Sequence, residues 1–177
     1  MDRRSRRRLP AAARTRVGAV RVILTVGHGN LPQDALIRNL QGAGVERVID
    51  VRSRPYSRWH PHFNRRRIAE ALTTAGMAYE WEPALGGKPE DPSLHTTDGT
   101  PDYALIARHK PFLDALDLLV ATSAEASTAI MCAEGDPAGC HRTVLIVPLL
   151  GERGVTVRHL LKDGTVVDDA PTTARLL

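Results

Sequence analysis

The sequence predicts a single α/β domain with a mostly parallel sheet of about five strands and helices on both faces. Short apolar runs rich in β-branched residues alternate with longer stretches whose apolar residues recur at helical spacing. Glycine and proline are frequent between these segments. The length of 177 residues suits one domain. No apolar run approaches the roughly 18 residues that a membrane span requires.

The first two strands have clear boundaries. Residues 20–26 (VRVILTV) are expected to form a buried strand that ends at the glycine-bearing turn of residues 27–30 (GHGN). Pro32 suits the first turn of the helix that follows, and residues 42–44 (GAG) end that helix. Residues 48–51 (VIDV) are expected to form a second short buried strand.

A helix and a third strand come next. Asn64 is expected to cap the helix that follows the second strand, and Gly76 is expected to end it. Residues 77–81 (MAYEW) are expected to form the third strand. The Gly- and Pro-rich residues 83–101 are expected to form a long loop, of the kind that serves a function or stays mobile.

The second half of the chain repeats the pattern. Residues 102–122 carry apolar residues at helical spacing, with Pro111 as a break or a restart. Residues 128–133 (TAIMCA) are expected to form the fourth strand, and residues 143–150 a largely buried helix. Residues 155–161 are expected to form the last strand, followed by a small edge feature or a loose end.

Polar residues follow the ends of four strands. His28 follows the first strand, Arg52 the second, Glu82 the third, and residues 132–142 the fourth. Because the crossovers of a parallel sheet share one hand, the carboxyl ends of its strands lie along one edge. Ligands of open α/β sheets bind at that edge. We therefore expect these polar groups to share one pocket.

The positive charge of the chain is concentrated in two places. The formal net charge is +4, but residues 1–16 hold seven arginines and one acid, which leaves −2 on the rest. Residues 1–19 are expected to be a disordered Arg-rich tail, and residues 20–177 the folded domain. Two cysteines are too few for a disulfide scaffold, and the N-terminus lacks a secretory pattern. These features predict a cytoplasmic protein with free thiols.

The second concentration is the basic segment, residues 52–67 (RSRPYSRWHPHFNRRR). It holds six arginines, two histidines and no acid, which leaves −8 on the remainder of the domain. Such a patch favours an anionic ligand. Arg54 and Arg58 alternate with Tyr56 and Trp59, a combination that binds single-stranded nucleic acid through phosphate contacts and base stacking. The alternative is a solvated loop with aromatic anchors.

Residues 132–142 (CAEGDPAGCHR) are the densest chemical feature of the chain. Cys140 stands at a predicted helix start, where the helix dipole lowers the pKa of a thiol. The alternative for Cys132 is a small buried hydrophobic residue. The spacing of the cysteines matches no common zinc motif. A metal site nevertheless stays open, with ligands from among Cys132, Cys140, His141, His28 and His159.

The chain resembles the bacterial family known as domain of unknown function 488. The resembling stretches are residues 25–40, residues 44–72 with their DVRS motif, residues 79–87, and residues 130–160 with CAE…CHR. The resemblance implies a compact α/β fold with a polar cleft, and it implies no reaction. Residues 88–101 lack the aromatic and arginine residues that many members carry there, which argues against a lid or substrate contact from them. The family's polar positions correspond to His28, Asp50, Arg52, Ser53, Pro55, Asn64, Glu134, Cys140, His141, Arg142 and His159.

The expected function is that of a hydrolase or transferase with an anion-binding cleft, acting on a nucleotide, nucleic acid or other phosphorylated substrate. The expected catalytic residues are His141, Glu134, His28 and Cys140. The expected anion ligands are Arg52, Ser53, Arg54, Arg58, Asn64 and Arg142, with Asp50 and His159 as orienting groups.

Two alternatives stay open. One is a non-catalytic nucleic-acid- or nucleotide-binding module that uses the basic segment, residues 52–67. The other is a buried polar network that only stiffens the fold. The expected partner is an anionic small molecule or nucleic acid and not a membrane, while the cofactor and the oligomeric state are unknown.

Overall fold

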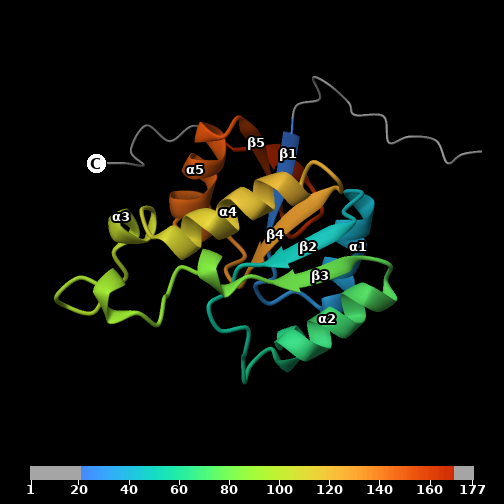
Figure 1. Ribbon diagram of the computed structural model, residues 1–177. Coiled ribbons are helices and arrows are strands. Elements are labelled where there is room, and N and C mark those ends of the chain that lie inside the picture. Colours follow the sequence, from blue (N-terminus) through green and yellow to red (C-terminus); the bar gives the residue numbers. More distant parts are fainter. Residues whose placement is uncertain (1–20, 170–177) are drawn as a thin grey trace, which may run out of the picture.

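Six strands form one sheet in the computed structural model, which describes residues 21–169 (Figure 1). The strand order is β3-β2-β4-β1-β5-β6, with β6 antiparallel and all other pairs parallel. The predicted mostly parallel α/β fold is confirmed, with one strand more than expected. The tail predicted for residues 1–19 lies outside the described residues. The strands are β1 (Arg21–Gly27), β2 (Arg47–Asp50), β3 (Ala78–Trp81), β4 (Thr128–Cys132), β5 (Val155–Leu160) and β6 (Val166–Asp168).

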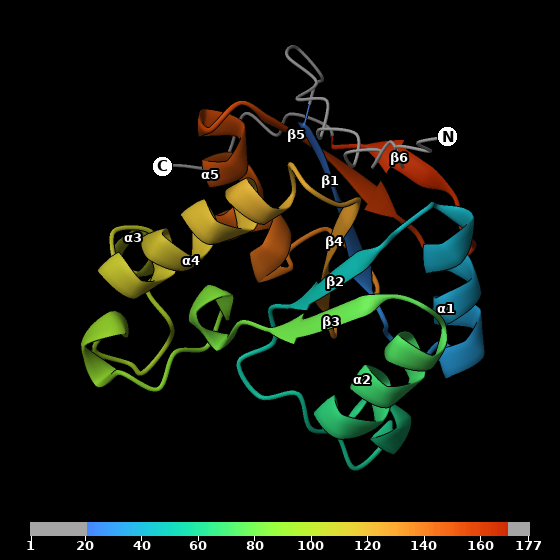
Figure 2. The same cartoon turned by 45° about the vertical axis from the view of Figure 1, so that its right-hand side comes forward.

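Helices cover both faces of the sheet, as Figure 2 shows. Because side chains alternate along a strand, Leu24 packs into the core beside α1 and α2, whereas Ile23 packs into the core beside α4 and α5. The two apolar cores therefore lie on opposite sides of the same strands. The helices are α1 (Gln33–Gly42), α2 (Arg65–Thr74), α3 (Tyr103–Ile106), α4 (Lys110–Thr122) and α5 (Val147–Glu152). None of the helices within residues 21–169 combines the length and apolar character needed to cross a membrane.

The helix expected over residues 102–122 is divided in two. Pro111 lies in the first turn of α4, so the predicted restart is correct. The preceding long loop contains two short 3₁₀ turns, and its buried Leu85 and Leu94 pack into the core beside α4. This packing fixes the loop against the domain.

The helix expected over residues 143–150 begins with a wide turn. Residues Arg142–Ile146 have π-helical hydrogen bonding, and the α-helical turns of α5 begin only at Val147. Pro148 has no N–H to donate to the carbonyl of residue 144, and its ring clashes with that carbonyl in a regular α-helix. A π turn relieves this conflict, and such turns are frequent at functional sites.

The parallel pairing of β1, β2 and β4 continues past the ends of these strands. The His28 N–H donates to the Cys132 carbonyl at 3.0 Å, and the Val51 N–H donates to the Met131 carbonyl at 3.0 Å. Gly27 pairs with Cys132 across the two strands. The loops that follow these strands therefore begin at the same level of the sheet, as expected for one shared edge.

We expect Gly27→Ala to destabilise the fold by about 3 kcal/mol, the upper end of the usual cost of overpacking. A Cβ at this position would lie 1.7 Å from the carbonyl oxygen of Glu134, which is backbone and has little room to move. Urea unfolding measures the loss. Gly42→Ala is the matched control, because its Cβ would meet no atom within 4 Å. Equal stability of the two variants would contradict the expectation.

Candidate functional site

A cavity of about 730 Å³ opens at the carboxyl edge of the sheet. We call it the main cavity. Three segments that are far apart in the sequence line it. They are the loop after β2, with Arg52, Ser53 and Arg54, the segment between β3 and α4, with Lys88, His95 and Tyr103, and the loop after β4, with Cys132, Glu134, Cys140 and His141.

Four potential metal-binding or reactive side chains meet in this cavity. One donor atom from each of Cys132, Glu134, Cys140 and His141 lies within 4.8 Å of the other three. The carboxylate of Glu134 lies 2.6 Å from the Cys132 sulfur and 3.4 Å from the Cys140 sulfur. His141 Nδ1 lies 3.6 and 3.9 Å from the same two sulfurs. We call these residues the Cys–Glu–His cluster.

The two thiols of the cluster differ in acidity. The hydrogen bond between the two thiols lowers the pKa of Cys140 and raises the pKa of Cys132. The positive charge of Arg142 lowers the pKa of Cys140 further. Partial burial raises the pKa of Glu134, but hydrogen bonds with the thiols outweigh this effect, so the pKa is lowered overall. Cys140 is therefore the more readily ionised sulfur, and Glu134 is a carboxylate at neutral pH.

Packing holds the imidazole of His141. A Cβ on Gly87 would lie 2.5 Å from the Cβ and Cγ of His141, so only glycine allows this approach. His141 Nε2 is buried and has no hydrogen-bond partner among residues 21–169. The backbone at Gly87 therefore contributes to the site by positioning the ring.

Arg142 lies beneath the loop that carries Glu134. Its side chain is 1% exposed, and Nη1 donates to the Glu134 carbonyl at 2.6 Å. It lines neither the main cavity nor the adjoining one described below. Within the described part of the chain no carboxylate pairs with it. Arg142 therefore shapes the loop and supplies positive charge from below.

A second polar network lies behind Arg52. Its Nε and Nη2 donate to the Asp50 carboxylate at 2.8 and 2.5 Å, and Nη1 lies 3.2 Å from His28 Nε2. The Tyr79 hydroxyl also donates to Asp50, at 2.7 Å. Asp50 is 0% and Arg52 is 6% exposed. The expected orienting role of Asp50 has this geometric basis, and the Arg52 charge is compensated within the protein.

His28 completes this network in its neutral form. Its ring stacks on Phe63 with centroids 4.1 Å apart, and Nδ1 lies 2.9 Å from the Gly29 carbonyl. A proton on Nδ1 and a lone pair on Nε2 facing Arg52 satisfy both contacts. Burial, together with the charge of Arg52, lowers the pKa of His28 to about 4.

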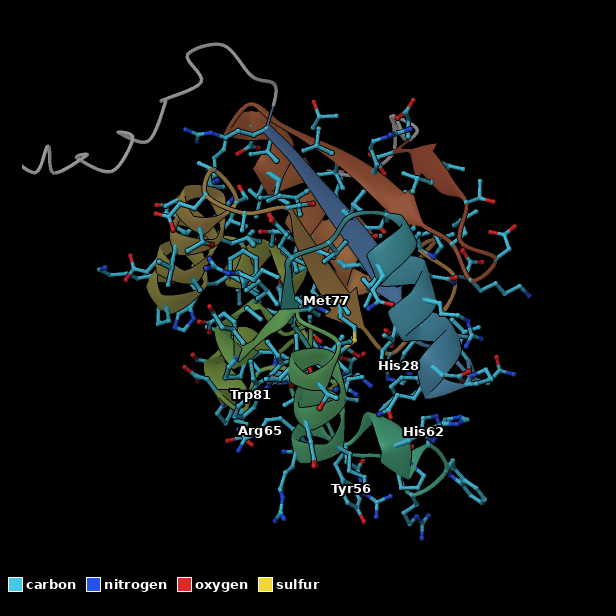
Figure 3. The ribbon with its side chains drawn as sticks, turned by 90° about the vertical axis from the view of Figure 1, so that its right-hand side faces the viewer. His28, Tyr56, His62, Arg65, Met77 and Trp81 are labelled. Atoms are coloured by element: carbon cyan, nitrogen blue, oxygen red, sulfur yellow. The ribbon has the colours of Figure 1, made fainter. Side chains whose placement is uncertain are left out.

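A second cavity of about 490 Å³ adjoins the main one. His28, Tyr56 and His60 line it, and it shares Arg52, Arg54 and Glu134 with the main cavity. Figure 3 shows His28 and Tyr56 below the sheet, toward the same end of the molecule. The two cavities share these walls, so the polar residues of both lie side by side at the carboxyl edge of the sheet.

Besides Arg142, other residues expected at this edge lie elsewhere, and Glu82 lines neither cavity. Arg58 lies over the exposed Trp59 ring, 5.8 Å from its centroid, and lines neither cavity. Asn64 precedes α2 as predicted, but its Oδ1 accepts from the Ser57 N–H at 2.6 Å and does not cap the helix. His159 bonds to Thr25 and Asp169 at the β5 side of the sheet.

Sequence reasoning missed the contribution of the loop between β3 and α4. Lys88, His95 and Tyr103 line the main cavity. The composition of residues 88–101 had put a substrate contact from that segment in doubt, and Tyr103 was not singled out. The Ser53 hydroxyl accepts from the Lys88 N–H at 2.9 Å, which ties this loop to the one after β2. The paired glycines at 86 and 87 were the available signal, because both approach neighbouring residues too closely for a Cβ.

We expect Asp50→Asn to cost about 3–5 kcal/mol of unfolding free energy, because it leaves the buried Arg52 guanidinium without a counter-charge. Urea unfolding followed by circular dichroism measures it. Asp34→Asn removes the exposed partner of Arg38 and is expected to leave the stability almost unchanged. A small effect at both positions would show that Arg52 finds compensation elsewhere.

Stability is expected to fall as the pH drops from about 6.5 to 4. The folded protein holds His28 neutral down to about pH 4, whereas the unfolded chain protonates it near 6.5. The unfolded state thus binds more protons in this window, and up to about 3 kcal/mol is lost on acidification. Urea unfolding of the wild type and His28→Gln across this range checks the sign. A difference between the two that is constant with pH would refute it.

One of the comparisons with known proteins found a match. The family model described as Domain of unknown function DUF488 matches residues 33–147, which is more than half of the chain. No curated protein and no solved structure matches the chain. The matched residues include Asp50 and Arg52 at the end of β2 and the whole Cys–Glu–His cluster. The chain therefore belongs to the DUF488 family.

Proposed function

We propose that this protein is a hydrolase or transferase that acts on a nucleotide or another phosphorylated substrate held in the main cavity. The observation that carries the proposal is the composition of that cavity. It places the cationic side chains of Arg54 and Lys88 in the same walls as the Cys–Glu–His cluster. An anionic group held by the cations would lie beside a carboxylate, a thiol and an imidazole.

The cationic side chains of the cavity that are available to a ligand are the exposed ones, Arg54 and Lys88. Arg52 is paired with the Asp50 carboxylate, and Arg142 donates to the Glu134 carbonyl and does not line the cavity. Among residues 21–169, the ion pair of Arg54 is a 3.4 Å contact with Glu90, and both side chains are at least 80% exposed. Such an exposed pair contributes little, so an incoming phosphate can replace Glu90. Lys88 is exposed and forms no ion pair within residues 21–169.

Glu134 supplies an exposed, ionised carboxylate that can accept a proton in this cavity. It is exposed, its pKa is lowered, and its carboxylate is ionised at neutral pH. In this proposal it accepts the proton of an attacking water or hydroxyl group. His28 is buried, neutral and committed to Arg52, so it maintains the walls of the pocket and transfers no proton.

The adjoining cavity favours a nucleotide among phosphorylated substrates. Tyr56 lines it and is 72% exposed, which leaves a face of its ring available for stacking on a base. Arg54 and Glu134 belong to both cavities. A phosphate at Arg54 would therefore place the base toward Tyr56 and the reacting bond toward the cluster.

We expect Glu134→Gln to lower kcat about 10²- to 10⁴-fold toward whichever compound the wild type converts in a panel of nucleotides and phosphate mono- and diesters. Arg54→Ala and Lys88→Ala are expected to raise KM more than they lower kcat, because they remove substrate binding. Gly151→Ala is the control, since its Cβ would meet no atom within 4 Å and the residue lines neither cavity. Wild-type protein that converts no compound of the panel would overturn the proposal.

A non-catalytic nucleic-acid-binding module is the second candidate. Trp59 is 81% exposed with Arg58 over its ring, and neither residue lines the main cavity. This candidate requires salt-sensitive binding of single-stranded oligonucleotides that Trp59→Ala and Arg58→Ala weaken and Glu134→Gln does not. Fluorescence anisotropy of a labelled oligonucleotide distinguishes it from the enzyme.

A further inference from the structure

We propose that Cys132, Cys140, His141 and Glu134 bind one zinc ion. This inference does not depend on the proposed function, because it rests on the donor atoms of the cluster and not on any substrate. It selects, among the histidines and cysteines considered from the sequence, His141 and both cysteines. It leaves out His28 and His159, and it adds Glu134.

The spacing of the donor atoms suits one small tetrahedral ion. Ligands bound to zinc at about 2.0–2.3 Å in tetrahedral geometry lie roughly 3.3–3.8 Å from one another. The distances from His141 Nδ1 to the two sulfurs are 3.6 and 3.9 Å, and Glu134 lies 3.4 Å from Cys140. The 2.6 Å contact between the Glu134 carboxylate and the Cys132 sulfur is shorter, so these two atoms have to move apart when the ion binds.

The chemistry of the donors selects zinc. Two sulfurs and an imidazole nitrogen are ligands for zinc and related transition metals, whereas magnesium and calcium require oxygen ligands. All three of these residues are buried, which reduces competition from water. A disulfide between the cysteines would need only the two sulfurs. It would not account for the imidazole nitrogen and the carboxylate that converge on the same point.

Arg142 balances the charge of the loaded site. Two thiolates and one carboxylate around Zn²⁺ carry a net charge of −1. The Arg142 guanidinium lies below this loop, is 1% exposed and has no carboxylate partner among residues 21–169. A buried cation without a counter-charge is costly. The anionic zinc centre supplies the missing charge.

The ion would face the main cavity. All four donor residues line that cavity, and Glu134 is exposed to solvent. Structural zinc sites are closed by four protein ligands in the interior, whereas reactive sites keep one position open to solvent or substrate. Glu134 is the ligand that can leave this position, because it alone of the four is exposed. Once it has left the ion, its carboxylate is free to accept a proton, as the proposed function requires.

The experiment uses the full chain, purified without a polyhistidine tag or a metal column. Inductively coupled plasma mass spectrometry is expected to find one zinc per chain. After zinc is removed with a chelator, Co²⁺ titration is expected to produce thiolate-to-cobalt charge-transfer bands and the intense visible bands of a tetrahedral site, saturating at one equivalent. These readouts need no variant and no substrate, so the outcome is independent of whether the protein turns over any compound.

Variants locate the ion. Cys132→Ser and Cys140→Ser are each expected to weaken Zn²⁺ affinity more than about 100-fold, since loss of a ligand exceeds the effect of an outer-shell change. Glu134→Gln is expected to keep the charge-transfer bands and shift the visible bands, because only the oxygen donor changes. Gly151→Ala is the control and should match the wild type in both affinity and spectrum.

Two results would overturn the proposal. One is wild-type protein with both thiols reduced that contains no stoichiometric metal and gives no charge-transfer bands with Co²⁺. The other is a Cys132–Cys140 disulfide in the purified protein whose reduction does not restore metal binding, which would make the pair a redox couple. Neither result would decide the proposed function, which is tested by anion binding and turnover.

Discussion

The candidate site depends on one close approach, between the end of β1 and the loop after β4. Parallel pairing of these strands continues past their ends through the bond from His28 N–H to the Cys132 carbonyl. Gly27 has no side chain, so the Glu134 carbonyl and the Arg142 guanidinium lie against its Cα. This contact turns the loop back over the sheet, which brings Glu134 and Cys140 to Cys132. A single added carbon at residue 27 would separate them.

The arginines of this edge fall into two groups according to burial. Arg52 and Arg142 are buried and hold the pocket together through Asp50 and the Glu134 carbonyl. Arg54 is exposed and is available to a ligand. Arg52 shows the origin of the distinction, because its buried charge is compensated in place by Asp50 before any ligand arrives. An exposed charge is compensated by water and can exchange partners at little cost.

Much of the fold was predictable because local rules determine it. The β-branched runs formed strands within one or two residues of the expected ends, and Pro111 restarted a helix where a helical first turn accepts proline. The failures occurred where a specific side-chain contact or a proline overrides the general preference. Asn64 has the right position for a cap, but its side chain bonds to Ser57 instead. The turn before Pro148 is a π turn, because a regular α-helical turn would bring the proline ring against the carbonyl of residue 144.

The sequence by itself determined the alternation of strands and helices, and with it the edge at which His28, Arg52 and residues 132–142 emerge. It determined this because hydrophobic periodicity and parallel crossovers are properties of short stretches. Only the tertiary structure decided which polar groups touch. Cys132 lies beside Cys140, Glu134 and His141. Arg142 lies below the loop that carries Glu134, and His159 hydrogen-bonds to Thr25. Side chains at one edge point to either face of the sheet, and packing between distant segments selects the face on which each can meet a partner.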